Sequence, residues 1–121
     1  MKLLLKSGSI SLSIDLKDTP TSRAVFEAAP FEARAQTWGD EVYFETPVSA
    51  KLEPDAKQVV DPGTVCFWTQ GDALALPFGR TPISTDDRPK LANPCNVLGS
   101  MKDFALLKKI KSGDKVRVEK A

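Results

Sequence analysis

The sequence contains no histidine among its 121 residues. Histidine is the side chain whose ordinary pKa lies nearest to physiological pH, which suits it to proton transfer. Its absence excludes Ser-His-Asp and Cys-His catalysis, the His-Arg-Asp loop of protein kinases and every histidine-based metal site. A general base in this protein would have to be a carboxylate, a tyrosine or a lysine with a shifted pKa.

Cysteine is also scarce, because only Cys66 and Cys95 are present. They lack the Cys-x-x-Cys spacing of zinc and thioredoxin-like sites, and small secreted domains usually carry more cysteine than this. We expect two buried thiols in a reducing compartment, with a single disulfide as the alternative. Long hydrophobic runs are missing as well: three leucines at 3–5 are too few for a signal peptide, and no stretch approaches the ~18 apolar residues of a spanning helix. These absences predict a cytoplasmic protein with no membrane partner.

Neither sign of charge is in excess, because seventeen basic and sixteen acidic side chains leave a net charge of +1. Nucleic-acid binders normally carry a basic stripe, so we expect no nucleic-acid partner. Hydrophobic residues make up 41% of the chain, which is typical of folded globular proteins. A chain of this length can bury a core unaided. We predict one domain over residues 1–121, with no cofactor and no metal.

Local patterns predict a β-hairpin followed by a short helix. Residues 9–16 alternate strictly between polar and apolar side chains, the period of a half-buried strand, and Gly8 supplies a turn from the segment before it. Thr19 is then a good N-cap, with Pro20 suited to the first helical position and Pro30 to the end. A helix near residues 20–29 is the result.

The remainder of the chain predicts further strands and one more helix. Ser100 and Asp103 resemble a capping box for a helix over 101–110, while residues 79–93 lack periodicity and predict a long irregular loop. Strand patterns cover 31–38, 41–45, 64–68, 73–78, 96–98 and 115–119, with a weaker candidate at 48–52. The fold class is therefore mainly β: a closed barrel of about eight strands with two short helices.

Six blocks of sequence carry a family resemblance in matching order. They are residues 37–48 (TWGDEVYFETPV), 62–63 (PG), 66–68 (CFW), 76–82 (LPFGRTP), 96–99 (NVLG) and 109–116 (KIKSGDKV). Together they resemble the cyclophilin-like family of small prokaryotic proteins, over nearly the whole chain. The resemblance implies the closed barrel that this family shares with peptidyl-prolyl isomerases, and most members of the family have no assigned activity.

The catalytic motif of true cyclophilins is not part of this resemblance. Those enzymes use Phe-His-Arg on an early strand, where the arginine polarises the substrate carbonyl, and this chain has no histidine. Residues 78–80 repeat only the spacing of phenylalanine and arginine, and they follow the strand begun by Pro62-Gly63 instead of preceding it. Arg34 lies in the early region without the two neighbours. The fold alone does not imply isomerase activity.

Candidate ligand-binding residues lie at the expected strand ends and turns. Aromatic side chains are few, 7% of the chain, and four of them occupy such positions. They could surround a pocket at one mouth of the barrel or simply fill the core. Arg80 would then favour an anionic or carbonyl-bearing ligand, unless it lies in a solvated loop. The full candidate set is Trp38, Tyr43, Trp68, Phe78, Arg80, Thr81 and Asn96.

Two functional hypotheses follow. The first is a non-catalytic module that binds a small molecule or a short peptide in an aromatic pocket. The second is an enzyme, either a weak peptidyl-prolyl isomerase using Arg80 or Arg34, or a component of an amide- or lactam-hydrolysing complex. The missing histidine and the displaced arginine favour the first. A homo-oligomer or a protein partner stays open in either case.

Overall fold

The computed structural model describes all 121 residues and begins with the predicted hairpin. Strand β1 (Lys2–Ser7) pairs antiparallel with β2 (Ile10–Leu16) across Gly8, which has a φ of 57°. This left-handed conformation favours glycine because it has no Cβ. The alternation buries Leu3 against Ile14 in the register, so one face of the hairpin enters the core.

The helix α1 (Pro20–Ala28) follows from local signals, and its prediction is confirmed. Its N-cap is Thr19, whose Oγ1 accepts a hydrogen bond from the Ser22 amide at 3.0 Å. The helix ends before Pro30, which follows a cis peptide bond. Val25 is fully buried, so α1 covers the main core. Neither this helix nor the second one has the length and hydrophobicity needed to cross a membrane.

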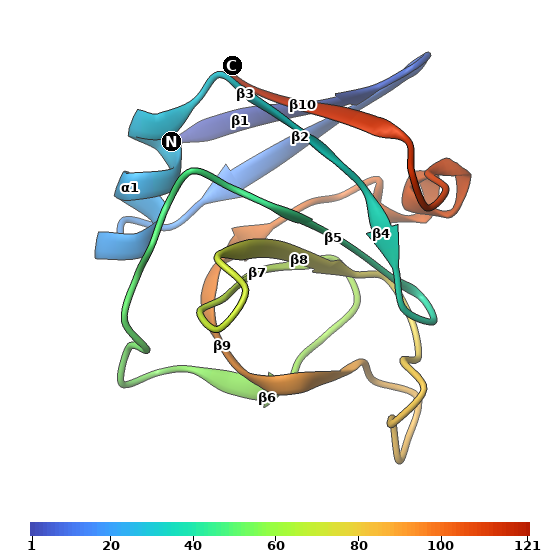
Figure 1. The fold of residues 1–121 in the computed structure, drawn as a ribbon. Helices are drawn as coiled ribbons and strands as arrows, with labels where there is room; N and C mark the ends of the chain where they lie inside the picture. Colours follow the sequence, from blue (N-terminus) through green and yellow to red (C-terminus); the bar gives the residue numbers. More distant parts are fainter.

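Ten strands form a barrel-shaped sheet that is nearly closed (Figure 1). The first and last strands in its order, β3 (Phe31–Arg34) and β4 (Gln36–Thr37), are two parts of one segment interrupted at Ala35. The segment pairs with β10 (Lys115–Lys120) on one side and β5 (Glu41–Glu45) on the other, which brings the two edges together. The other strands are β6 (Lys57–Val59), β7 (Thr64–Trp68), β8 (Ala73–Pro77) and β9 (Lys90–Ser100). The predicted fold class is confirmed, with a strand count above eight.

Three local predictions differ from the structure. The loop expected over 79–93 ends at Lys90, where the eleven-residue β9 begins. Its first half has polar residues and a proline, and it is a strand because it pairs with β6. Residues 48–52 form no strand. The second helix is a 3₁₀ helix over Phe104–Lys109, and Asp103 makes no capping hydrogen bond.

The barrel wall separates two apolar clusters. The larger one contains 21 buried residues and lies beneath α1 and the 3₁₀ helix. Alternation along β5, β7 and β8 sends every second side chain to the other face, where a smaller cluster forms. That smaller cluster consists of Val60, Cys66, Ala75, Leu91, Cys95 and Val97, with Tyr43 and Trp68 packed against it.

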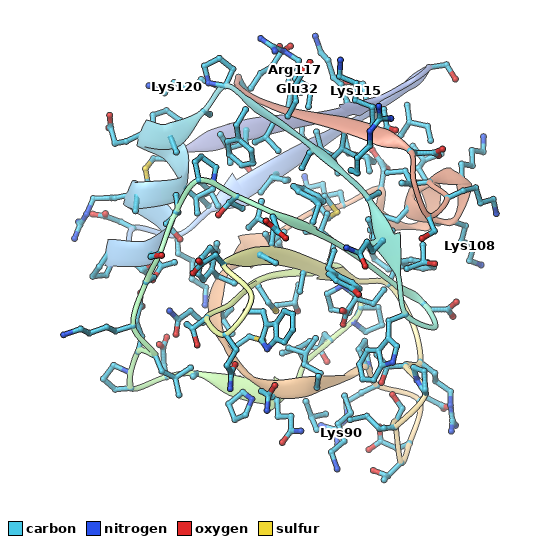
Figure 2. All side chains as sticks on the ribbon, in the orientation of Figure 1. Glu32, Lys90, Lys108, Lys115, Arg117 and Lys120 are labelled. Carbon is cyan, nitrogen blue, oxygen red and sulfur yellow. The ribbon has the colours of Figure 1, made fainter.

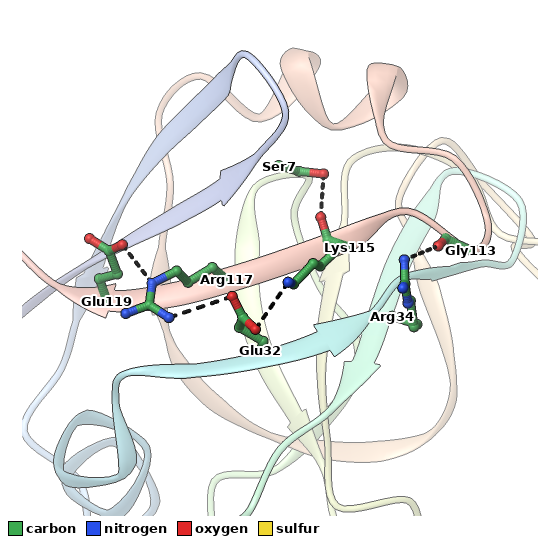
Figure 3. Close-up of polar contacts among 7 residues, drawn as sticks. All are labelled: Ser7, Glu32, Arg34, Gly113, Lys115, Arg117 and Glu119. Carbon is green, nitrogen blue, oxygen red and sulfur yellow. Dashed lines mark hydrogen bonds and ion pairs between the residues drawn. The ribbon is translucent and has the colours of Figure 1, made fainter.

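A row of ion pairs crosses the outer surface over β1, β10 and β3, and Figure 3 shows the part of it on β10 and β3. Glu32 contacts Lys115 at 3.3 Å and Arg117 at 3.5 Å, and Glu119 contacts Arg117 at 2.8 Å and Lys6 at 3.2 Å. Figure 2 shows Lys115 and Arg117 on the side of the molecule opposite β6. Exposed pairs of this kind add little stability.

Candidate ligand-binding site

A cavity of about 270 Å³ lies against the smaller apolar cluster. This volume is just below the range of roughly 300–1,000 Å³ that is usual for ligand pockets, so the cavity suits a small molecule. Strands β5, β7, β8 and β9 supply most of its wall. Its lining consists of Trp38, Glu41, Tyr43, Trp68, Ala75, Leu91, Ala92 and Cys95.

The strand register explains why this space is empty. Ala75 on β8 pairs with Tyr43 on β5 and with Cys66 on β7, so these three residues form one row across the sheet. Ala75 has the smallest side chain of the row and lies between two larger ones. The methyl group leaves a hollow that the neighbouring aromatic rings surround but do not fill.

Three half-buried aromatic side chains form the walls of the cavity. The rings of Tyr43 and Trp68 lie 6.3 Å apart between centroids and at 86°, so they make two adjoining walls at right angles. The Trp68 indole N–H donates to Oδ1 of Asn93 at 3.1 Å, and the Tyr43 hydroxyl donates to Oε1 of Gln36 at 3.1 Å. These bonds hold both rings in place. Trp38, at the end of the β4 segment, supplies the third wall.

One carboxyl group lies in this apolar lining. Glu41 is only 6% exposed, and its Oε1 has no hydrogen-bond partner. Burial raises the pKa of Glu41 from 4.5 to about 7. Burial, followed by the charge of Glu41, raises the pKa of the Cys95 thiol to about 12. The thiol is therefore neutral near pH 7, and Glu41 is the one group in the lining that carries charge there. No lysine or arginine lines the cavity.

The family model for cyclophilin-like proteins matches residues 1–119. The chain belongs to the cyclophilin-like family. The structure is similar to that of a hypothetical protein of Archaeoglobus fulgidus, with a TM-score of 0.84, 36% identity, and coverage of 100% of this chain and 95% of that one. It also resembles McbB in complex with tryptophan, with a TM-score of 0.72, 15% identity, and coverage of 98% of this chain and 44% of McbB. No curated protein matches the chain.

In this cyclophilin-like protein, three of the seven predicted site residues meet at the cavity: Trp38, Tyr43 and Trp68. The structure places Phe78 at the same end of the barrel as Trp38, since the Phe78 amide donates to the Asp40 carbonyl at 2.8 Å. Its side chain, however, packs against the main core on the opposite face of the wall. Phe78 follows Leu74 and Leu76 of β8 at intervals of two residues, so it lies on the same face as these leucines, which also face that core.

The other three predicted residues, Arg80, Thr81 and Asn96, also lie outside the cavity. Arg80 is exposed, and its guanidinium donates to the Ser84 carbonyl at 3.3 Å. Thr81 is buried and holds the loop by donating to the Lys90 carbonyl. Arg34, considered for catalysis, donates instead to the Gly113 carbonyl at 3.3 Å. The polarity expected from Arg80 is therefore absent from the cavity, whose charged group is an acid.

Asn96 is fully buried, and its hydrogen bonds give it a structural role. Its Oδ1 accepts from the Glu53 amide at 2.7 Å, and its Nδ2 donates to Oγ1 of Thr21 at 3.0 Å and to the Lys51 carbonyl at 2.9 Å. Oγ1 of Thr21 donates to the Glu53 carboxylate. These bonds fasten the segment around residues 51–53 to α1 and β9.

Sequence reasoning missed Glu41, Ala75, Leu91, Ala92 and Cys95. For Glu41 a signal existed, because residues two apart on a strand share a face and Tyr43 was already a candidate. Glu45 continues the same alternation and is exposed, so the alternation of residues 41, 43 and 45 is equally typical of a strand face that meets solvent. The two ends of β5 face different surroundings, and this difference comes from the strands packed against each end.

Proposed function

We propose that this cyclophilin-like protein is a non-catalytic binding module that holds a small molecule in the cavity beside Ala75. One observation carries the proposal: three aromatic side chains from separate segments surround an apolar space of about 270 Å³. Large apolar walls with few polar groups are typical of small-molecule sites. The compact volume favours a small molecule over an extended peptide.

Two further observations support this reading. A part of McbB that makes up 44% of its chain has the same fold, and McbB was solved in complex with tryptophan, which is a small molecule. At 15% identity the likeness concerns the fold, so the ligand class is part of the proposal. A cytoplasmic location belongs to the same proposal and is supported by Cys66 and Cys95, which are both buried and free.

The two tryptophans of the chain provide a direct test. Both Trp38 and Trp68 line the cavity, so a ¹⁵N-labelled sample has two indole N–H signals and each reports on this site. We expect saturable shifts of both signals with L-tryptophan, indole or a proline-containing tetrapeptide, with the smaller probes binding more tightly. If neither these probes nor any other small molecule titrated at the same two signals moves either of them at millimolar concentration, the proposed function is wrong.

A pair of matched variants separates cavity binding from other effects. Ala75→Leu fills the floor of the cavity and should abolish the shifts, whereas Ala33→Leu on β3 makes the same change outside the cavity and should preserve them. Ala92→Leu acts at an exposed part of the lining, which avoids disturbing the core. Unchanged binding in both Ala75→Leu and Ala92→Leu would place the ligand elsewhere.

A further inference from the structure

The lining of the cavity contains an acidic side chain and no basic one. Among its eight lining residues Glu41 is the acid, and neither a lysine nor an arginine accompanies it. Its Oε1 is buried and receives no hydrogen bond, and the residue as a whole is only 6% exposed. A buried carboxylate without a counter-charge is unfavourable. A ligand that brings a positive charge into the cavity would supply the missing partner.

The aromatic walls favour the same kind of ligand. The face of an aromatic ring is electron-rich, and it attracts an ammonium group that lies within about 6 Å of the ring centre. Tyr43 and Trp68 stand at right angles, and Trp38 adds a third ring. A group of rings at differing angles can surround a rounded cation, whereas a flat ligand stacks on one ring at a time. The polar tips of Tyr43 and Trp68 are already bonded to Gln36 and Asn93.

We propose that the occupant of this cavity is a small organic cation, an alkylated or quaternary ammonium group, held between the three aromatic rings with Glu41 as its counter-ion. This inference rests on the proposed function and names the ligand class for the same cavity. An anion would meet a carboxylate with no cationic side chain to offset it. A neutral ligand would leave the carboxylate of Glu41 unpaired.

Choline and 3,3-dimethyl-1-butanol form a suitable probe pair, because they have nearly the same shape and only choline is charged. Titration of each into the labelled protein, followed at the two indole signals, gives both affinities. At pH 8 we expect choline to bind at least tenfold more tightly than the alcohol, as an ion pair and cation–π contacts together predict.

The pH dependence gives an independent readout in the native protein. The charge of choline does not change between pH 6 and 8, whereas the pKa of about 7 means that Glu41 loses its proton across this interval. The other titratable groups facing Glu41 are Tyr43 in the lining and the thiols of Cys66 and Cys95. Burial raises the pKa of both thiols. The affinity for choline should therefore rise about tenfold from pH 6 to pH 8, while that for the alcohol should not rise.

Glu41→Gln keeps the shape of the side chain and removes its charge. It should abolish the rise with pH and reduce the preference for choline to the part that the cation–π contacts supply. Glu45→Gln makes the same change in net charge on the same strand at an exposed position, and it should behave as the native protein.

The possible outcomes separate the two proposals. Equal affinities for choline and the alcohol, or shifts with L-tryptophan or the alcohol but none with choline, overturn the cation proposal and leave the proposed function standing. A preference for choline that is undiminished in Glu41→Gln, or a rise with pH that persists there, overturns the role of Glu41 as counter-ion. If no probe moves either indole signal, both proposals fail.

Discussion

Replacing Glu41 with glutamine should change how the stability of the protein depends on pH. Burial holds the pKa of Glu41 at about 7 in the folded protein, against 4.5 for the ordinary carboxyl group. Between these two values the folded state binds more protons than the unfolded state. Stability contributed by this group therefore falls as pH rises through the interval, and it is constant above it.

The size of the effect follows from the displaced pKa. A difference of about 2.5 pKa units corresponds to about 3 kcal/mol of unfolding free energy, at 1.36 kcal/mol per unit. Near pH 4 the carboxyl group is mostly protonated in both states, so its burial costs almost no unfolding free energy there. At pH 8 the native protein loses the full amount, about 3 kcal/mol of unfolding free energy, by burying a charged carboxylate, whereas Glu41→Gln has no charge to bury. From pH 4 to pH 8 the unfolding free energy of the variant should therefore rise by about 3 kcal/mol relative to that of the native protein.

Urea unfolding followed by far-ultraviolet circular dichroism, at whole pH units from 4 to 8, measures this difference. No histidine contributes to the titration in this range, since the chain contains none. Subtracting the two curves of unfolding free energy against pH removes the contributions of the carboxyl groups that both proteins share. Glu45→Gln serves as the control and should follow the native curve, because its side chain is exposed. A difference between native protein and Glu41→Gln that stays constant with pH would refute the reasoning.

Three further changes test the fold by the same unfolding assay. Asn96→Ala leaves the Glu53 amide and the Lys51 carbonyl without their partner, and should cost about 3 kcal/mol; a loss below about 1 kcal/mol would contradict the structural role. Thr19→Ala removes the N-cap of α1 and should cost about 1 kcal/mol, with Thr19→Ser restoring it. Gly99→Ala places a Cβ against the carbonyl of Asp15 where β2 meets β9, and should cost at least about 3 kcal/mol; native-like stability would show that this contact can relax.

The elements that could be predicted from sequence are those whose causes lie close together in the chain. The alternation over residues 9–16 and Gly8 define the first hairpin, and Thr19 with Pro30 bounds α1. Short-range periodicity and backbone restriction act within a few residues, so they are visible before any packing is known. The 3₁₀ helix illustrates the limit, since a helix over 101–110 was expected from the sequence but its helix type was not.

The site, by contrast, depends on contacts between distant segments. Its aromatic residues were identifiable as candidates, but their grouping required β5, β7, β8 and β9 to curve into one wall. The pairing of β6 with the first half of β9 turned an expected loop into part of the lining, at Leu91 and Ala92.

Glu41 and Phe78 show, at single residues, the difference between what the sequence determines and what tertiary packing determines. Alternation along a strand determines which side chains share a face, and that much the sequence determined by itself. Whether a face meets the core, a cavity or water was decided by the closure of the sheet, which buried Glu41 beside Tyr43 and turned Phe78 towards the main core. The physical reason is that alternation is a property of one strand, whereas burial depends on which other strands and helices pack against it.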